Sequence, residues 1–130
     1  MSKIKAIDLF SGAGGFSLAA LELGIDVLSA IELDKDACDT YRDNLINKRE
    51  NNIQLLNQDI MSISPVSMMD DLSLNEGELD IIIGGPPCQG FSSHRIKNSG
   101  VDDPRNNFMM VFLRCSSGFC FYQLSLLFSY

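Results

Sequence analysis

A chain of 130 residues is about the length of one domain and can bury a small core, and its 45% hydrophobic and 21% charged residues are typical of a globular protein. The net charge of −7 argues against a segment that binds nucleic acid by itself, because phosphate contacts need clustered Lys and Arg. The chain has four cysteines without a Cys-x-x-Cys pair and one histidine, which predicts no metal site and no disulfide framework. Its start lacks the apolar core of a signal peptide, so we expect a cytoplasmic protein with no membrane segment.

The N-terminal part predicts a strand, a glycine turn and a helix in succession. The apolar, β-branched run of residues 4–10 ends at "SGAGG", which is typical of a buried strand that enters a turn. The residues that follow predict a helix that ends at Gly24. Its apolar face is expected to consist of Phe16, Ala19, Ala20 and Leu23.

Three further strands are expected along the chain. Residues 25–32 predict a strand that ends on Glu32, and residues 33–45 a helix with Asp34 or a neighbour as its N-cap. "NIQLLNQDI" predicts a third strand with Asp59 at its end, residues 61–78 a loop with room for one helical turn, and residues 79–85 the most apolar strand. Alternating strands and helices predict an α/β fold, with a Rossmann-like, doubly wound and mostly parallel sheet.

The glycine loop and Glu32 together predict an adenosine-containing cofactor. Glycines between a strand and a helix let a ligand approach the helix N-terminus. Glu32 stands about 20 positions further on, where a carboxylate can accept hydrogen bonds from ribose hydroxyls. Ser17 occupies the place of the third dinucleotide-binding glycine, which favours S-adenosyl-L-methionine over NAD. Asp59 is a candidate for the adenine amino group or, alternatively, a helix cap, and the glycines could also serve the turn alone.

The run "GGPPCQGFSS" is expected to carry the reactive group. The last predicted strand delivers Cys88 to the carboxyl edge of the sheet, and Pro86 and Pro87 stiffen its approach. Gly90 then frees the chain to leave as a loop. A thiolate in this position is a candidate nucleophile, with a buried structural thiol as the alternative. For Cys38, Cys115 and Cys120 the structural interpretation is preferred.

The motifs of this chain resemble those of the cytosine-5 DNA methyltransferases, in order and in spacing, from about residue 4 to residue 114. The quoted matches are "DLFSGAGGFS", "IELD", "NQDI", "GGPPCQGFS" and "DDPRNNFMMVFLR". Enzymes that methylate amino groups carry an aromatic residue after their proline pair, where this chain has Cys88. The tRNA-cytosine members usually have proline where Gly90 stands, so the resemblance favours DNA.

The resemblance implies a set of roles for the matching positions. Cys88 would attack C6 of a cytosine flipped out of double-stranded DNA, which activates C5 to accept the methyl group of S-adenosyl-L-methionine. Cofactor-binding roles would fall to Phe10, Gly12, Gly14, Gly15, Glu32, Leu33, Asp59 and Ile60. Contacts with the opened DNA would fall to Gln89, Ser92 and Arg105, although Arg105 could equally be a solvated residue at a helix start.

The sequence departs from the family after residue 114. The family continues to a strand that ends Glu-Asn-Val, whereas this chain has no acidic residue after Asp103 and an uncharged stretch from residue 115 to residue 130. Residues 1–114 are therefore expected to be the N-terminal part of a catalytic domain that is incomplete on its C-terminal side. Residues 115–130 are expected to be an aberrant tail, and the target-recognition domain to be missing.

Such a fragment would hold the nucleophile and much of the cofactor site, but it could not select or flip a base. We expect it to be marginally stable and to transfer little or no methyl alone. The alternatives are a non-catalytic remnant that binds cofactor and one half of a split enzyme completed by a second, C-terminal chain. Only a split enzyme would regain activity when the missing part is added.

Overall fold

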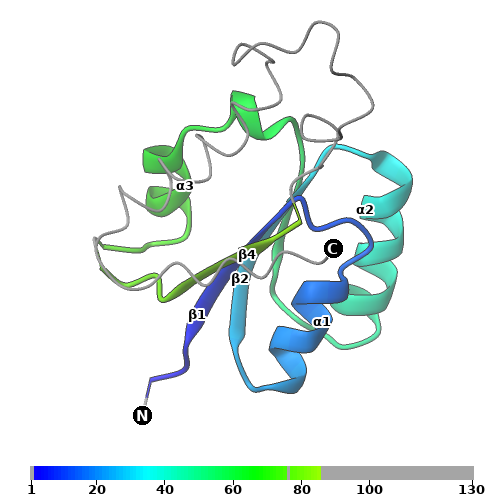
Figure 1. Ribbon diagram of the computed structural model, residues 1–130, viewed down its shortest axis with the longest axis horizontal. Coiled ribbons are helices and arrows are strands. Elements are labelled where there is room, and N and C mark those ends of the chain that lie inside the picture. Colours follow the sequence, from blue (N-terminus) through cyan, green and yellow to red (C-terminus); the bar gives the residue numbers. More distant parts are fainter. Residues whose placement is uncertain (1, 76, 86–130) are drawn as a thin grey trace, which may run out of the picture.

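The computed structural model describes residues 2–75 and 77–85, which form a parallel sheet with helices on both faces (Figure 1). Its strands lie in the order β3-β2-β1-β4, and every neighbouring pair is parallel, as the sequence predicts. The elements in chain order are β1 (Lys5–Leu9), α1 (Gly15–Glu22), β2 (Asp26–Glu32), α2 (Lys35–Tyr41), η1 (Arg42–Asn47), β3 (Gln54–Asn57), η2 (Ile60–Ser62), α3 (Pro65–Asp71) and β4 (Ile81–Gly84).

Strand β1 lies between β2 and β4, so the carboxyl ends of these strands meet at one edge. Leu9 at the end of β1 is paired with Ile31 of β2 and with Gly84 of β4. Glu32, the last residue of β2, is paired with Asn57 of β3. The turns that follow the strands therefore lie close together, at the edge where open α/β sheets bind ligands.

The two faces of the sheet carry separate cores because side chains alternate along each strand. Ile7 and Leu9 of β1 belong to one core with Met68 of α3. Ala6 belongs to the other, with side chains of α1, β2, α2 and η1. Figure 1 shows the corresponding layers, with α1 and α2 on one side of the sheet and α3 on the other.

Helix α1 ends as predicted, but it buries a partly different face. Gly24 has a φ of +77°, its N–H donates to Leu21 O, and the Ile25 N–H donates to Ala20 O, which is the hydrogen-bond pattern of a Schellman C-cap. The predicted apolar face is confirmed at Ala20, which is buried, and Phe16 is half-buried. It is wrong for Ala19 and Leu23, which are exposed (Leu23 to 78%), and Ser17 is buried instead. The turn into the helix points Ser17 at the sheet, where it finds a polar partner on β1.

Helix α2 begins at the predicted cap and then widens. The Asp34 side chain accepts a hydrogen bond from the Ala37 N–H at 2.8 Å. Beyond Tyr41 the helix continues as the π-helical segment η1, in which the Lys48 N–H donates to Asp43 O, five residues earlier. Tyr41 and Leu45 are buried side by side in the core beneath this segment.

The stretch between β3 and β4 is more regular than expected. The interpretation as a loop with one helical turn is wrong for residues 65–71, which form α3. Ser64 caps this helix by accepting from the Ser67 N–H, and Pro65 occupies its first turn. Proline is well placed there because the first N–H groups of a helix have no partner within it. Met68 fastens the helix to the core.

Candidate functional site

The turn between β1 and α1 forms the centre of the candidate site. The Ser11 N–H donates to Ile31 O of the neighbouring strand, and the Gly14 N–H donates back to Ser11 O, both at 3.0 Å. Gly12 and Gly14 have φ values of +55° and +98°, which favour glycine. The main chain of the turn is therefore tied to β2 and leads directly into the N-terminus of α1.

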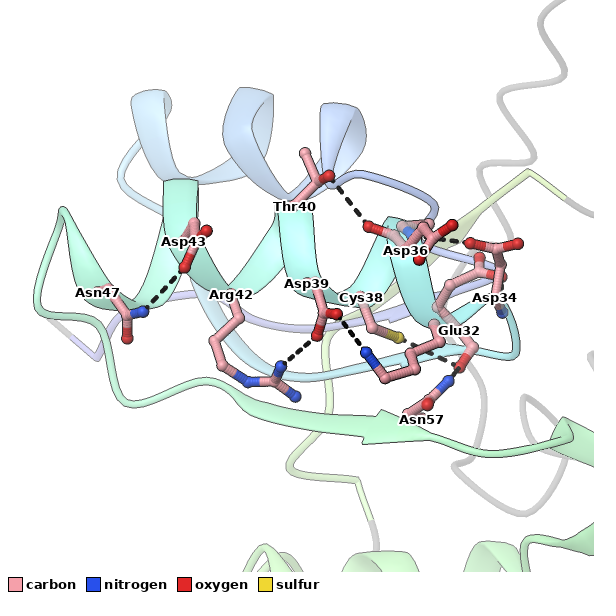
Figure 2. A network of polar contacts seen from close by, with 12 residues as sticks. Glu32, Asp34, Asp36, Cys38, Asp39, Thr40, Arg42, Asp43, Asn47 and Asn57 are labelled. Atoms are coloured by element: carbon pink, nitrogen blue, oxygen red, sulfur yellow. Dashed lines mark hydrogen bonds and ion pairs between the residues drawn. The ribbon is translucent and has the colours of Figure 1, made fainter.

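The Glu32 carboxylate joins the glycine turn to the start of α2. Its Oε2 accepts a hydrogen bond from the Gly12 N–H at 2.8 Å, and its Oε1 accepts one from the Asp34 N–H at 2.9 Å. A carboxylate has about four acceptor positions, so two remain for a ligand. The Glu32 main chain is held as well, since Cys38 and Asn57 both donate to its carbonyl oxygen, as Figure 2 shows. Cys38 is fully buried, in line with its expected structural role.

Gly14 is packed against α2 and η1 with no room for a side chain. A Cβ atom on Gly14 would lie 2.8 Å from Cδ2 of the Tyr41 ring and closer still to Cδ1 of Leu45. Gly12 and Gly15 have nothing within 4 Å of that position. The glycine turn is therefore backed by protein at Gly14, whereas Gly12 and Gly15 border open space.

A buried polar chain runs behind this turn. The Tyr41 hydroxyl donates to Ser17 Oγ at 2.7 Å, and the Ser17 hydroxyl donates to Asp8 Oδ2 at 2.6 Å. All three residues are fully buried. The chain connects α2, the first turn of α1 and the end of β1, which are the elements that surround the glycine turn.

Burial raises the pKa of Asp8 from 3.8 to about 6, and the hydrogen bonds from Ser17 oppose that rise. Burial likewise raises the pKa of Tyr41 to about 12, so its hydroxyl remains a donor at neutral pH. Asp8 Oδ1 and the nearby Ser11 Oγ are buried without a hydrogen-bond partner among the described residues. A buried polar atom without a partner is costly, and a bound ligand or an ordered water can satisfy it.

Asp8, Ser17 and Tyr41 were not among the predicted site residues. One signal was present, because Asp8 interrupts an apolar strand at a position that shares a face with buried Ala6. Its partners could not be found in the same way, since Ser17 and Tyr41 lie 9 and 33 positions further along the chain (17 − 8 and 41 − 8) and meet it only in the folded state.

The predicted adenine-side residues lie around the carboxyl ends of β1, β2 and β3. Phe10 is half-buried against the core and has a φ of +59°, which is unusual for an aromatic residue. Leu33 is 66% exposed, and its main-chain carbonyl oxygen accepts a hydrogen bond from the Asn57 side chain at 2.8 Å. Ile60 is 5% exposed and belongs to the core. Asp59 caps η2 by accepting from the Met61 N–H at 2.9 Å, which is the alternative role the sequence suggested.

Strand β4 brings the chain to the same edge. A Cβ atom on Gly84 would collide with the carbonyl oxygen of Leu9, so only glycine permits this approach to β1. The nucleophile candidate Cys88 follows four residues later in the sequence (88 − 84) and lies outside the described residues. The predicted DNA contacts Gln89, Ser92 and Arg105 lie outside them too, as do Cys115 and Cys120.

Two further kinds of site are absent from residues 2–75 and 77–85. This part of the chain holds no cluster of His, Cys, Asp or Glu with the arrangement of a metal site. It also has no helix with the length and apolar character needed to cross a membrane.

Residues 4–117 match the model of a protein family described as C-5 cytosine-specific DNA methylase. The type II methyltransferase M1.HphI of Haemophilus parahaemolyticus is 42% identical over 109 residues, which are 83% of this chain and 27% of that protein. M.AquIA of Picosynechococcus sp. is 38% identical over 85% of this chain and 42% of its own length. M.HgiGI of Herpetosiphon aurantiacus is 32% identical over 85% of this chain and 79% of its own length.

The fold is shared with solved methyltransferase structures. A proposed DNA modification methyltransferase encoded within an E. coli prophage superposes with a TM-score of 0.70 at 35% identity, over 90% of this chain and 29% of that one. A SAM-dependent methyltransferase from Agrobacterium tumefaciens shares the fold at a TM-score of 0.50 and 21% identity, over 67% of this chain and 27% of that one. The chain spans between 23% and 42% of the length of the first three curated relatives.

Proposed function

The chain belongs to the C-5 cytosine-specific DNA methylase family, and we propose that it carries the cofactor site and the nucleophile of a DNA (cytosine-5)-methyltransferase. The methyl donor would be S-adenosyl-L-methionine, which supplies an electrophilic methyl group for C5 of a cytosine. The observation that carries the proposal is the hydrogen bond between Gly12 and Glu32. It brings the glycine turn and a carboxylate that would accept from ribose hydroxyls together at the carboxyl edge, where β4 also ends.

The described residues fit a cofactor of this kind. Glu32 keeps acceptor positions for ribose hydroxyls, and the open side of Gly12 and Gly15 leaves room for the amino-acid end. The unpartnered Asp8 Oδ1 beneath the turn gives the site a negative character that suits a cationic ligand. Tyr41 and Leu45 close the other side of the turn, so Gly14 would shape the binding surface from behind.

The adenine would bind among residues at the ends of the strands. Phe10 and Leu33 would flank the ring, and the high exposure of Leu33 is consistent with a surface that a ligand covers. Asp59 and Ile60 would border the ring's edge. Because the Ile60 side chain packs in the core, its contribution would come from the main chain.

The reaction would proceed through a covalent bond between Cys88 and the base. The Cys88 thiolate would attack C6 of a cytosine extruded from double-stranded DNA, and the electrons of the C5–C6 double bond would form the bond from C5 to the methyl group. The bond between that methyl group and the sulfonium sulfur of the donor would break, with S-adenosylhomocysteine as the leaving group. A base then removes the C5 proton, the double bond re-forms, and the thiolate leaves. Gln89, Ser92 and Arg105 would contact the opened DNA.

Two assays test this proposal. In the first, the chain is incubated with methyl-tritiated S-adenosylmethionine and double-stranded DNA, alone and together with the C-terminal part of a relative such as M1.HphI. We expect tritium in the 5-methyl group of cytosine with the complementing part present and none with Cys88→Ser. Transfer that survives Cys88→Ser would overturn the covalent mechanism.

The second assay separates binding from chemistry. Isothermal titration of S-adenosylmethionine into the 130-residue chain should give saturable binding, and Cys88→Ser should bind equally well because the thiol acts on the base rather than on the cofactor. A chain that is folded by circular dichroism and binds no cofactor would overturn the assignment of the cofactor site.

A further inference from the structure

Tyr41 is buried behind the glycine turn and is not among the residues proposed to contact the cofactor. We propose that Tyr41 is a positioning residue for the glycine turn, acting through Ser17 and Asp8 and through its ring contact with Gly14. The inference rests on the proposed cofactor site, because it concerns how α2 prepares that site before a ligand arrives. Tyr41 does not contact the ligand itself.

The ring of Tyr41 limits where the turn can lie. It is fully buried beneath η1, and its Cδ2 atom is 2.8 Å from the place that a Cβ of Gly14 would occupy. Leu45 reaches the same place from the next turn of the helix. With two side chains against its main chain, Gly14 cannot move toward α2, which sets the position of the turn on that side.

The hydroxyl of Tyr41 completes a chain of donors that runs in one direction. Tyr41 donates to Ser17, and Ser17 donates to Asp8 Oδ2. When Asp8 is ionised, both of its oxygens can only accept. Ser17 belongs to the first turn of α1, so the chain fixes the start of that helix relative to β1. Removing the Tyr41 hydroxyl would leave the buried Ser17 oxygen without its donor and loosen this connection.

Because Asp8 can ionise, the hydrogen-bonded chain from Tyr41 to Asp8 should make cofactor affinity depend on pH. Among the described residues, the titratable groups that act on Asp8 are Glu32 of β2 and Tyr41 of α2. On β4, Asp8 is paired with Ile83, which has no titratable group. S-adenosylmethionine carries a net positive charge, so it favours ionised Asp8 over the protonated form. Its affinity should therefore fall as the pH drops through the pKa of Asp8, which is about 6.

The experiment is a series of isothermal titrations of S-adenosylmethionine into the 130-residue chain between pH 5 and pH 8. Tyr41→Phe should weaken binding at pH 7 by about fivefold to tenfold, as expected when a buried hydrogen bond that orders the turn is lost. Ser17→Ala should act in the same way and also move the midpoint of the pH profile upward, because its hydroxyl favours the ionised carboxylate. Thr40→Val is the control, since the Thr40 hydroxyl bonds to Asp36 O on the exposed side of α2.

The outcomes separate the inference from the function on which it rests. If the unsubstituted chain binds and Tyr41→Phe lowers only the melting temperature, with affinity and pH midpoint unchanged, the positioning role is overturned. If the unsubstituted chain binds nothing, the proposed cofactor site fails and the inference with it. Should Tyr41→Phe not fold, Ser17→Ala carries the same expectation, and unchanged affinity and midpoint in that variant would overturn the inference.

Discussion

Gly12 and Glu32 are 20 positions apart in the sequence and are joined by a 2.8 Å hydrogen bond from the Gly12 N–H to Oε2. The same carboxylate accepts from the Asp34 N–H, so one side chain connects the glycine turn with the start of α2. The site is therefore organised before any ligand binds, and a ribose would meet a carboxylate whose orientation is already set. Preorganisation of this kind raises affinity because less freedom is lost on binding.

Glu32→Gln should weaken S-adenosylmethionine binding by about tenfold or more, since charge-assisted hydrogen bonds are the stronger ones. The amide keeps one acceptor oxygen but turns an NH2 group toward one of the two main-chain donors. Isothermal titration checks this. Asp39→Asn on the exposed side of α2 is the matched control, because Asp39 pairs only with Lys35 and Arg42 in the contacts of this helix. Equal affinity for Glu32→Gln and the unsubstituted chain would contradict the prediction.

The stability of the chain should depend on pH through Asp8. Its pKa is 3.8 when unfolded and about 6 when folded, so the folded state binds more protons between these values. The stabilisation from protonated Asp8 is complete below about pH 4 and is lost as the pH rises through 6. It amounts to about 3 kcal/mol at about 1.4 kcal/mol per pKa unit.

Urea unfolding at a series of pH values, in the unsubstituted chain and in Asp8→Asn, isolates this contribution. Other carboxyl groups titrate in both proteins, so the difference between the two profiles belongs to Asp8. We expect the free energy of unfolding of the unsubstituted chain to fall relative to Asp8→Asn between pH 4 and pH 6. A constant difference over that range would show that the buried carboxyl does not titrate there.

Gly14→Ala and Gly12→Ala should differ in cost although both replace a glycine with positive φ. No atom lies within 4 Å of the place that a Cβ of Gly12 would occupy, so alanine there costs only the left-handed conformation, about 1 kcal/mol. Alanine at Gly14 would also force Tyr41 and Leu45 aside, which brings the expected loss to about 2–4 kcal/mol. Thermal or urea unfolding of the two variants measures the difference in stability. Equal losses would mean that Tyr41 and Leu45 move aside without a measurable cost.

At position 10, glycine should give a more stable protein than alanine, which reverses the usual order. Glycine usually destabilises a protein relative to alanine, by about 0.5–1 kcal/mol. At Phe10 the φ of +59° reverses this, so Phe10→Gly should be about 1 kcal/mol more stable than Phe10→Ala. Both variants should lose cofactor affinity because both lack the ring. Greater stability of the alanine variant would indicate that the backbone relaxes out of the left-handed region.

Local signals in the sequence predicted most of the fold. The strands were visible as apolar runs with acidic or glycine ends, and Gly24 and Asp34 marked helix ends through interactions with near neighbours. The loop expected at residues 61–78 is wrong for α3, because a proline in the first turn after a serine cap favours a helix.

The candidate site was predictable only in part. The glycine turn and Glu32 follow a known spacing, so both could be named from the sequence. The face that α1 buries could not be predicted in this way. Ser17 points inward and donates to Asp8, whereas a rule based on apolar faces places a serine on the exposed side. Tyr41 resembled an ordinary core residue, since its polar partner lies 24 positions earlier in the sequence.

Because η1 is a π-helical segment, the number of residues in it affects the glycine turn. A helical segment with i→i+5 hydrogen bonds accommodates one residue more than an α-helix of the same rise, and removal of one residue would restore the tighter winding. That change would rotate Leu45 with respect to Tyr41 and take one of the two side chains away from Gly14. A single-residue deletion on the solvent side of η1 would thus reach the glycine turn without altering any residue that contacts it.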